Sequence, residues 1–134
     1  MTRENRLMDI DNYILYLNTV YKNELKAYPN IPVTLLGFSQ GAATVSRWAL
    51  QESIVYEKLI LWAGIFPDDM DFEKGKEVLR TKQVHQVYGS KDPFLTDARI
   101  GEMKGLAEKL GVKSDPIIFD GGHEIHEETL INLI

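Results

Sequence analysis

The chain has 134 residues, of which 44% are hydrophobic and 26% are charged, and its net charge is −5. This is the composition of a globular protein, and its acidity argues against nucleic acid or an anionic membrane surface as a partner. Because it contains no cysteine, disulfides, thiolate metal ligands and cysteine nucleophiles are excluded. The sequence shows neither a signal-peptide pattern nor a membrane span. We therefore expect one cytoplasmic domain over residues 1–134.

Apolar residues at helical spacing predict an amphipathic helix over residues 4–27. The pattern then predicts, in chain order, a strand over 32–38, a helix over 41–51, a strand over 58–63, a loop over 65–76, a strand over 83–88, a helix over 96–110, a strand over 116–119 and a helix over 124–134. Strands that alternate with such connections indicate an α/β fold with a parallel sheet and flanking helices.

Residues 37–41 read Gly-Phe-Ser-Gln-Gly, a G-x-S-x-G motif between a predicted strand and a predicted helix. In this context the motif forms a nucleophile elbow, a strained turn that presents the serine at the end of the sheet. We expect Gly37 and Gly41 to be required because a Cβ at either position would collide with the crossing backbone. Ser39 is therefore a candidate nucleophile, and the alternative is a tight turn without chemistry.

Asp92 and His123 also follow predicted strands, in the segments Gly-Ser-Lys-Asp-Pro and Gly-Gly-His-Glu-Ile. The carboxyl ends of parallel strands share one edge of a sheet, and the chain order Ser, Asp, His is that of α/β-hydrolases. A serine hydroxyl needs a general base, a histidine can supply it, and a carboxylate fixes the histidine tautomer. We therefore expect Ser39 as nucleophile, His123 as general base and acid, Asp92 as orienting carboxylate, and the Gln40 N–H as oxyanion donor.

Other carboxylates and histidines are alternatives for these roles. Asp68, Asp69 and Asp71 follow the second strand and are rivals for the acid. His85 lies within a strand pattern and is interpreted as a sheet-face residue, and His126 is interpreted as solvated. Because no metal-binding motif accompanies the histidines, we expect no metal site.

The segments at residues 37–43, 89–93 and 121–125 resemble those of the phospholipase/carboxylesterase family of α/β-hydrolases, which includes acyl-protein thioesterases and small bacterial esterases. The resemblance covers essentially the whole chain, and GFSQG and GGHEI are its most specific parts. It implies hydrolysis of carboxylic esters or thioesters through an acyl-enzyme, without a metal or organic cofactor. The catalytic residues that it implies are Ser39, Asp92 and His123.

Members of that family also carry strands before the first helix predicted here, so the chain resembles the C-terminal portion of such a hydrolase. Those strands hold a loop that completes the oxyanion hole, and loss of one oxyanion donor lowers the rate by about a hundred- to a thousandfold. The strand before Ser39 would then expose an apolar edge that favours self-association. A second interpretation is therefore a non-catalytic hydrolase remnant or half-domain that acts by association with another chain.

Apolar residues near the predicted strand ends are candidates for an acyl pocket: Trp62, Phe66, Met70, Phe94 and Ile125. In an acidic chain, such a pocket favours a small-molecule ester that is neutral or hydrophobic over an anionic one. A related hydrolase that acts on peptides or lactones is a third interpretation, and the sequence leaves it open.

Overall fold

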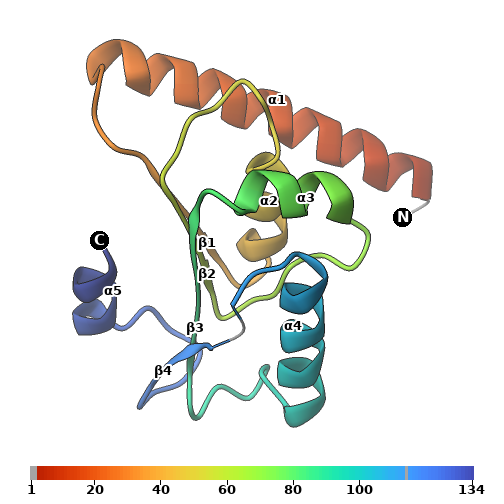
Figure 1. Cartoon of the computed structure of the whole chain (residues 1–134), viewed down its shortest axis with the longest axis vertical. Helices are drawn as coiled ribbons and strands as arrows, with labels where there is room; N and C mark the ends of the chain where they lie inside the picture. The colour runs from red at the N-terminus through yellow and green to blue at the C-terminus, as the bar shows by residue number, and fades with distance from the viewer. Residues whose placement is uncertain (1–2, 114) are drawn as a thin grey trace.

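The computed structural model describes residues 3–113 and 115–134 (Figure 1). Helices and strands alternate along the chain, with the bounds α1 Arg3–Ala27, β1 Thr34–Phe38, α2 Gly41–Trp48, β2 Lys58–Trp62, α3 Phe72–Leu79, β3 Gln83–Gly89, α4 Asp97–Lys109, β4 Ile117–Phe119 and α5 Glu127–Leu133. In this part of the chain, four strands form one parallel sheet. The expected α/β fold with a parallel sheet is therefore confirmed.

The strands occur in the sheet in their chain order, β1-β2-β3-β4. The pairing places Phe38 beside Trp62 at the ends of β1 and β2, and Gly89 beside Phe119 at the ends of β3 and β4. The segments that follow the strands therefore leave the sheet at one edge, which is where parallel sheets bind ligands. All three segments that carry candidate site residues begin at this edge.

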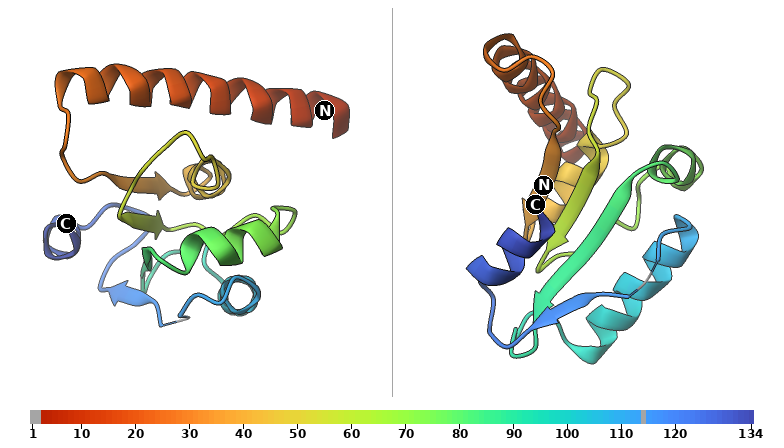
Figure 2. Two further views of the ribbon diagram at one scale, coloured as in Figure 1. Left: turned by 45° about the horizontal axis from the view of Figure 1, so that its top comes forward. Right: turned by 60° about the vertical axis from the view of Figure 1, so that its left-hand side comes forward.

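The sheet separates two apolar cores of unequal size. Helices α2, α3 and α4 lie on one side of the sheet and α5 on the other (Figure 2). Leu59 and Leu61 of β2 belong to the larger core, whereas Ile60 and Trp62 belong to the smaller core on the side of α5. Successive strand side chains point to opposite faces. Because both faces of β2 are covered, its sequence is apolar without alternation.

Helix α1 lies at the periphery, and its C-terminal half is held by contacts with Trp48 and Val55. The Trp48 indole N–H donates to the Asn18 side chain at 2.9 Å. The Tyr21 hydroxyl accepts from the Val55 N–H at 2.8 Å, and the Tyr21 ring meets the Trp48 ring edge-on at 6.2 Å between centroids. Among the described residues, no helix combines the length and the apolar character needed to cross a membrane.

The segment expected to be a loop over residues 65–76 contains the start of α3, so that expectation is wrong. Asp71 caps α3, since its carboxylate accepts from the Lys74 N–H at 3.1 Å. Gly75 lowers the helix propensity of this segment, which is why the pattern favours a loop. In the structure a Cβ at Gly75 would lie 2.6 Å from Leu110, so the glycine lets α3 pack closely against the end of α4.

β1 pairs with β2, and within the described residues no strand pairs with its other edge. The sequence of β1 is Thr-Leu-Leu-Gly-Phe, with no charged residue, and Leu36 is 37% exposed. Edge strands that lack charges are prone to pair with another strand.

Candidate active site

Ser39 lies at the tip of the turn between β1 and α2. Its φ of +57° is in the left-handed region, which costs an L-residue roughly 1–2 kcal/mol. The Ser39 N–H donates to the Trp62 carbonyl at 2.8 Å, and the Ser39 carbonyl accepts from the Ala42 N–H at 3.1 Å. The neighbouring strand and the first turn of α2 therefore hold the serine in the conformation expected of an elbow.

Two glycines allow the backbone to pack closely around this turn. A Cβ at Gly37 would lie 2.3 Å from the Gly41 carbonyl oxygen, and a Cβ at Gly64 would lie 2.2 Å from the Ser39 carbonyl oxygen. A Cβ at Gly41 would meet nothing within 4 Å, so the expectation that Gly41 is sterically required is wrong. Gly64 has that role instead. Gly64 follows β2 and contacts Ser39 from this neighbouring strand. Because Gly64 lies outside the G-x-S-x-G motif, the motif does not indicate that a glycine is needed there.

The structure brings Ser39, His123 and Asp92 together in a chain of hydrogen bonds. His123 Nε2 is 3.0 Å from Ser39 Oγ, and His123 Nδ1 is 2.7 Å from Asp92 Oδ2. The tautomer protonated on Nδ1 donates to the carboxylate and leaves Nε2 to accept from the serine hydroxyl. The Asp92 side chain is 0% exposed and the His123 side chain 22% exposed. This arrangement can move a proton from the serine to the imidazole.

Backbone contacts between two loops set the position of Asp92. Its Oδ1 accepts from the Phe94 N–H at 2.9 Å, which leaves Oδ2 for His123. The Lys91 N–H donates to the Gly121 carbonyl at 2.8 Å. A Cβ at Gly89 would lie 2.3 Å from that same carbonyl oxygen. Close approach of the loops after β3 and β4 therefore aligns the carboxylate with the imidazole.

The rival carboxylates have other partners. Asp69 forms ion pairs with Arg6 and Arg47, and Asp71 caps α3. Asp68 is exposed. Asp92 is the carboxylate that the structure places at His123.

The remaining histidines lie in other contacts. His85 is half-buried in β3, and its burial lowers its pKa below the usual value. His126, expected to be solvated, instead caps α5: its ring stacks on Phe119 at 5.1 Å, and its Nδ1 lies 2.8 Å from Thr129 Oγ1. For this reason α5 begins later than expected. Among the described residues, no group of three or more His, Asp or Glu side chains is placed to hold a metal ion.

Two aromatic rings flank the imidazole of His123. The centroid of Phe38 is 4.9 Å and that of Phe94 is 4.7 Å from the imidazole centroid. Phe94 was expected near the site as a pocket residue, whereas Phe38 had no expected role. Phe38 precedes the serine in the motif, and its place at the end of β1 directs its ring toward the histidine.

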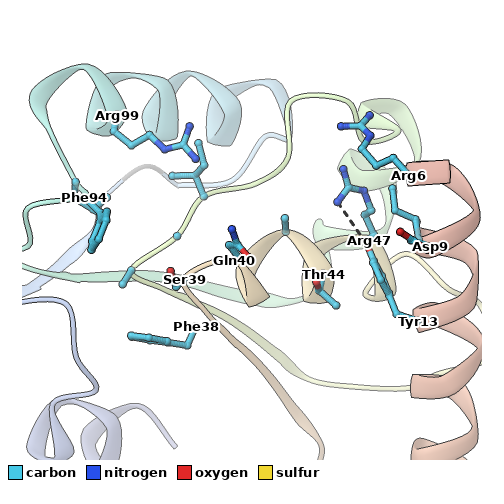
Figure 3. A pocket seen from close by; sticks show the side chains of 16 residues that line it. Arg6, Asp9, Tyr13, Phe38, Ser39, Gln40, Thr44, Arg47, Phe94 and Arg99 are labelled. Carbon is cyan, nitrogen blue, oxygen red and sulfur yellow. Dashed lines mark hydrogen bonds between the residues drawn. The ribbon is translucent and has the colours of Figure 1, made fainter. Parts of the chain in front are cut away.

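A groove of about 1040 Å³ lies beside Ser39 and extends along α2 to α1 (Figure 3). Of the five residues expected to form an acyl pocket, Phe94 lines this groove. Trp62, Phe66 and Met70 are buried in the cores, and Ile125 is 42% exposed outside the groove. Trp62 at the end of β2 packs in the smaller core, and Phe66 and Met70 pack in the larger core. The groove wall is formed by α1, α2, the start of α4 and the segment after β2, where Ala63, Gly64 and Ile65 line it.

The chain matches a known family in sequence and known proteins in fold. A family model described as phospholipase/carboxylesterase matches residues 2–134. YahD, solved with malic acid, is 19% identical with a TM-score of 0.66, over 94% of this chain and 61% of that chain. Esterase PE8 is 21% identical with a TM-score of 0.67, over 96% and 60%. Acyl-protein thioesterase 2 of Zea mays is 15% identical with a TM-score of 0.67, over 92% and 61%.

Because these sequence identities are low, the structural likeness shows that the fold is shared and nothing more. In each comparison this chain spans about three-fifths of the solved chain, 61%, 60% and 61%. None of the curated proteins compared with the sequence matches it.

Proposed function

Because the chain belongs to the phospholipase/carboxylesterase family, we propose that it is a serine hydrolase that cleaves carboxylic esters through an acyl-enzyme. The observation that carries the proposal is the pair of hydrogen bonds that links Ser39 Oγ through His123 to Asp92, at 3.0 and 2.7 Å. The buried carboxylate, the imidazole and the hydroxyl come from three different loops at one sheet edge. Three independent strand ends that converge in this way are what nucleophilic catalysis by serine requires.

In the acylation step, His123 Nε2 takes the proton from Ser39 Oγ as this oxygen attacks the ester carbonyl. Asp92 holds the tautomer protonated on Nδ1 and stabilises the imidazolium that forms. The imidazolium then gives its proton to the departing alcohol oxygen, and the acyl group stays on Ser39. Water activated by the same histidine hydrolyses the acyl-enzyme and regenerates the serine.

The tetrahedral intermediate carries a negative charge on the former carbonyl oxygen, and we assign the Gln40 N–H as its donor. Gln40 is the N-cap residue of α2. The first N–H groups of a helix have no intrahelical acceptor, and the helix dipole favours negative charge there. One such donor contributes on the order of a hundred- to a thousandfold in rate.

Esters and thioesters fit the same chemistry, since both present an acyl carbonyl with a leaving group. One structural neighbour is named an esterase and another an acyl-protein thioesterase, which supports acyl transfer as the reaction class. The groove of about 1040 Å³ beside Ser39 has room for a small-molecule ester. The proposed steps use neither a metal nor an organic cofactor.

Hydrolysis of p-nitrophenyl esters of increasing acyl length tests the proposal, with an acyl thioester and a peptide substrate run in parallel. The wild type should release p-nitrophenol with saturation kinetics, and Ser39→Ala should lower kcat by about 10⁶-fold. Ser53→Ala removes the hydroxyl of an exposed serine outside the groove and should leave the rate unchanged. Equal rates for the wild type and Ser39→Ala would show that this serine is not the nucleophile.

A second candidate function, association with another copy through β1, is favoured by the unpaired edge of that strand. In the described residues β1 has β2 as its paired neighbour, and the strand carries no charge. A lysine on an edge strand blocks such pairing. Sedimentation should therefore show a dimer for the wild type and a monomer for Leu36→Lys. A wild type that stays monomeric at every concentration would exclude this function, and covalent labelling of Ser39 by a fluorophosphonate would support hydrolysis instead.

A further inference from the structure

The groove beside Ser39 follows one stripe of α2. Gln40, Ala43, Thr44 and Arg47 all line it, and their spacing of i, i+3, i+4 and i+7 places them on one face of a helix. Ser39 lies at one end of this stripe and Arg47 at the other (Figure 3). Arg47 lies seven positions after Gln40 on the helix, which is a distance of about 10 Å along the axis.

The charge of the groove lining differs from the charge of the whole chain. Arg6, Arg47 and Arg99 line the groove, and Asp9 is the one acidic residue among the described lining residues. The chain as a whole carries a net charge of −5. Net charge alone favours a neutral substrate, but the residues that a substrate would meet in the groove are mainly cationic.

Arg6 of α1 and Arg47 of α2 lie at the end of the groove that is remote from Ser39 (Figure 3). Both contact Asp69, which is not a lining residue, and Arg47 Nη2 lies 2.6 Å from Asp69 Oδ1. Burial raises the pKa of Asp69, but the hydrogen bond and charge of Arg47, and then those of Arg6, more than offset this and hold the pKa below its usual value. The ionised Asp69 thus balances one of the two guanidinium charges, and Asp9 is a further carboxylate beside Arg6 on the groove lining (Figure 3).

The two guanidinium groups also keep hydrogen-bond donors beyond those that Asp69 uses. Each guanidinium has five N–H donors, and Asp69 accepts through one nitrogen of each. Arg47 Nη1 lies 3.5 Å from the Tyr13 hydroxyl, which is at the limit of a hydrogen bond. Guanidinium groups match the geometry of carboxylates, which they bind through two parallel N–H···O bonds.

Taking the proposed hydrolase activity as its premise, we propose that the substrate is an ester whose acyl chain ends in a carboxylate. That carboxylate binds Arg6 and Arg47 while the ester carbonyl lies at Ser39. The acyl chain crosses Ala43 and Thr44 on α2, over the helix length of about 10 Å. Arg6 and Arg47 are thus specificity-determining residues, and they do not take part in the chemical steps.

Paired p-nitrophenyl esters test this assignment. One series consists of monoesters of dicarboxylic acids, from succinate through suberate to sebacate, and the other of methyl-terminated esters with the same chain lengths. The wild type should prefer the acid-terminated ester by about tenfold in kcat/KM once the chain is long enough to reach the arginines. Succinate is too short, so its monoester should show no such preference.

Substitutions separate a binding role from a purely structural one. Arg47→Gln and Arg6→Gln should each lower kcat/KM for the long acid-terminated ester by about tenfold more than kcat/KM for the methyl-terminated ester, which removes the preference. If the two arginines only hold α1 against α2, their substitution would instead lower kcat/KM for both esters by the same factor. Arg80→Gln is the matched control, because it removes the same charge from an exposed residue outside the groove, and it should keep the preference. If Arg47→Gln does not fold, Arg6→Gln carries the test.

The assignment is overturned if the wild type hydrolyses both series equally, or if the preference survives in both arginine variants. Failure of the hydrolase proposal has a different signature, namely that neither series is hydrolysed and Ser39 is not acylated. Binding of suberate to the Ser39→Ala protein, measured by calorimetry, then decides the anion site without turnover. Suberate binding by Ser39→Ala that is lost in the Ser39→Ala, Arg6→Gln double variant supports the carboxylate site at the arginines. Absence of suberate binding by Ser39→Ala excludes that site.

Discussion

The two ends of the groove are built by different means. At the Ser39 end, the Asp92 side chain is 0% exposed and the His123 side chain 22% exposed, and backbone contacts between loops fix both residues. At the Arg47 end, the side chains of Arg6 and Asp69 are 50% and 36% exposed and that of Arg47 is 18% exposed, and ion pairs join α1, α2 and the loop after β2.

We infer from this difference that the Ser39 end holds a single geometry and that the Arg47 end can adjust. Hydrogen bonds that are buried and charge-assisted are short and strong, and they hold reacting atoms in a single geometry. Exposed ion pairs contribute about 0–1 kcal/mol, and their long side chains can change partners at little cost. We infer that the Ser39 end determines the reaction and that the Arg47 end determines which acyl chain is bound.

The same change of Asp to Asn made at both ends should show this contrast most strongly. Asp92→Asn keeps an acceptor for the Phe94 N–H but presents an amide N–H to His123 Nδ1. The imidazole then carries its proton on Nε2, which cannot accept from Ser39, and kcat should fall by about 10⁴-fold. Asp69→Asn should change kcat for a methyl-terminated ester by less than about tenfold. Steady-state kinetics measure both, and losses of similar size would refute the contrast.

Substitution of glycines on the two sides of Ser39 tests how the rigid end is packed. Gly37→Ala places a Cβ 2.3 Å from the Gly41 carbonyl oxygen, and such overpacking should lower the free energy of unfolding by about 3 kcal/mol. Gly41→Ala meets nothing within 4 Å and should change it by less than about 1 kcal/mol. Urea denaturation measures both, and comparable losses would mean that Gly41 is required after all.

The backbone strain at Ser39 should appear as a difference in the free energy of unfolding between two variants of this residue. Ser39→Gly removes the cost of a left-handed φ of +57°, whereas Ser39→Ala keeps it. Both variants lose the hydroxyl, so neither should hydrolyse esters. Ser39→Gly should exceed Ser39→Ala in free energy of unfolding by about 1 kcal/mol. A less stable glycine variant would indicate that the turn is not strained.

The smallest expected effect concerns the pH dependence of stability at the Arg47 end. The pKa of Asp69 lies below its usual value of 3.8 in the folded protein. The stabilisation that follows is present above that usual pKa and is lost as the pH falls through the folded-state pKa. Because the carboxylate is partly exposed, Asp69→Asn should cost less than about 1 kcal/mol at pH 7. In urea denaturation the cost should shrink at about pH 3, and a larger cost in acid would contradict the ion pairs.

The Ser39 end was largely predictable because its residues carry local signals. Ser39, Asp92 and His123 each follow an apolar strand, and parallel strands end at one edge of the sheet. Their positions after the strands therefore predicted that the three side chains lie close together, as they do in the structure. Gly64 could not be identified in this way, because the contact that requires a glycine there is made across the sheet with Ser39.

The Arg47 end could not be predicted for a related reason. Asp69 is separated by 63 residues from Arg6 and by 22 residues from Arg47, and no periodic pattern connects the three. Charged residues on amphipathic helices are normally solvated, so each arginine taken alone has no special signal. α3 was missed because Gly75 weakens the helical pattern, although Asp71 at its start is an ordinary N-cap signal.

The most direct measurement is the mass of the protein quenched with acid during turnover of a p-nitrophenyl ester, followed by peptide mapping. We predict a mass increase of one acyl group on the peptide that contains Ser39, absent from Ser39→Ala and small in His123→Ala. Release of p-nitrophenol without an acylated Ser39, or with the acyl group on another residue, would contradict the assignment of Ser39, His123 and Asp92 as the catalytic group.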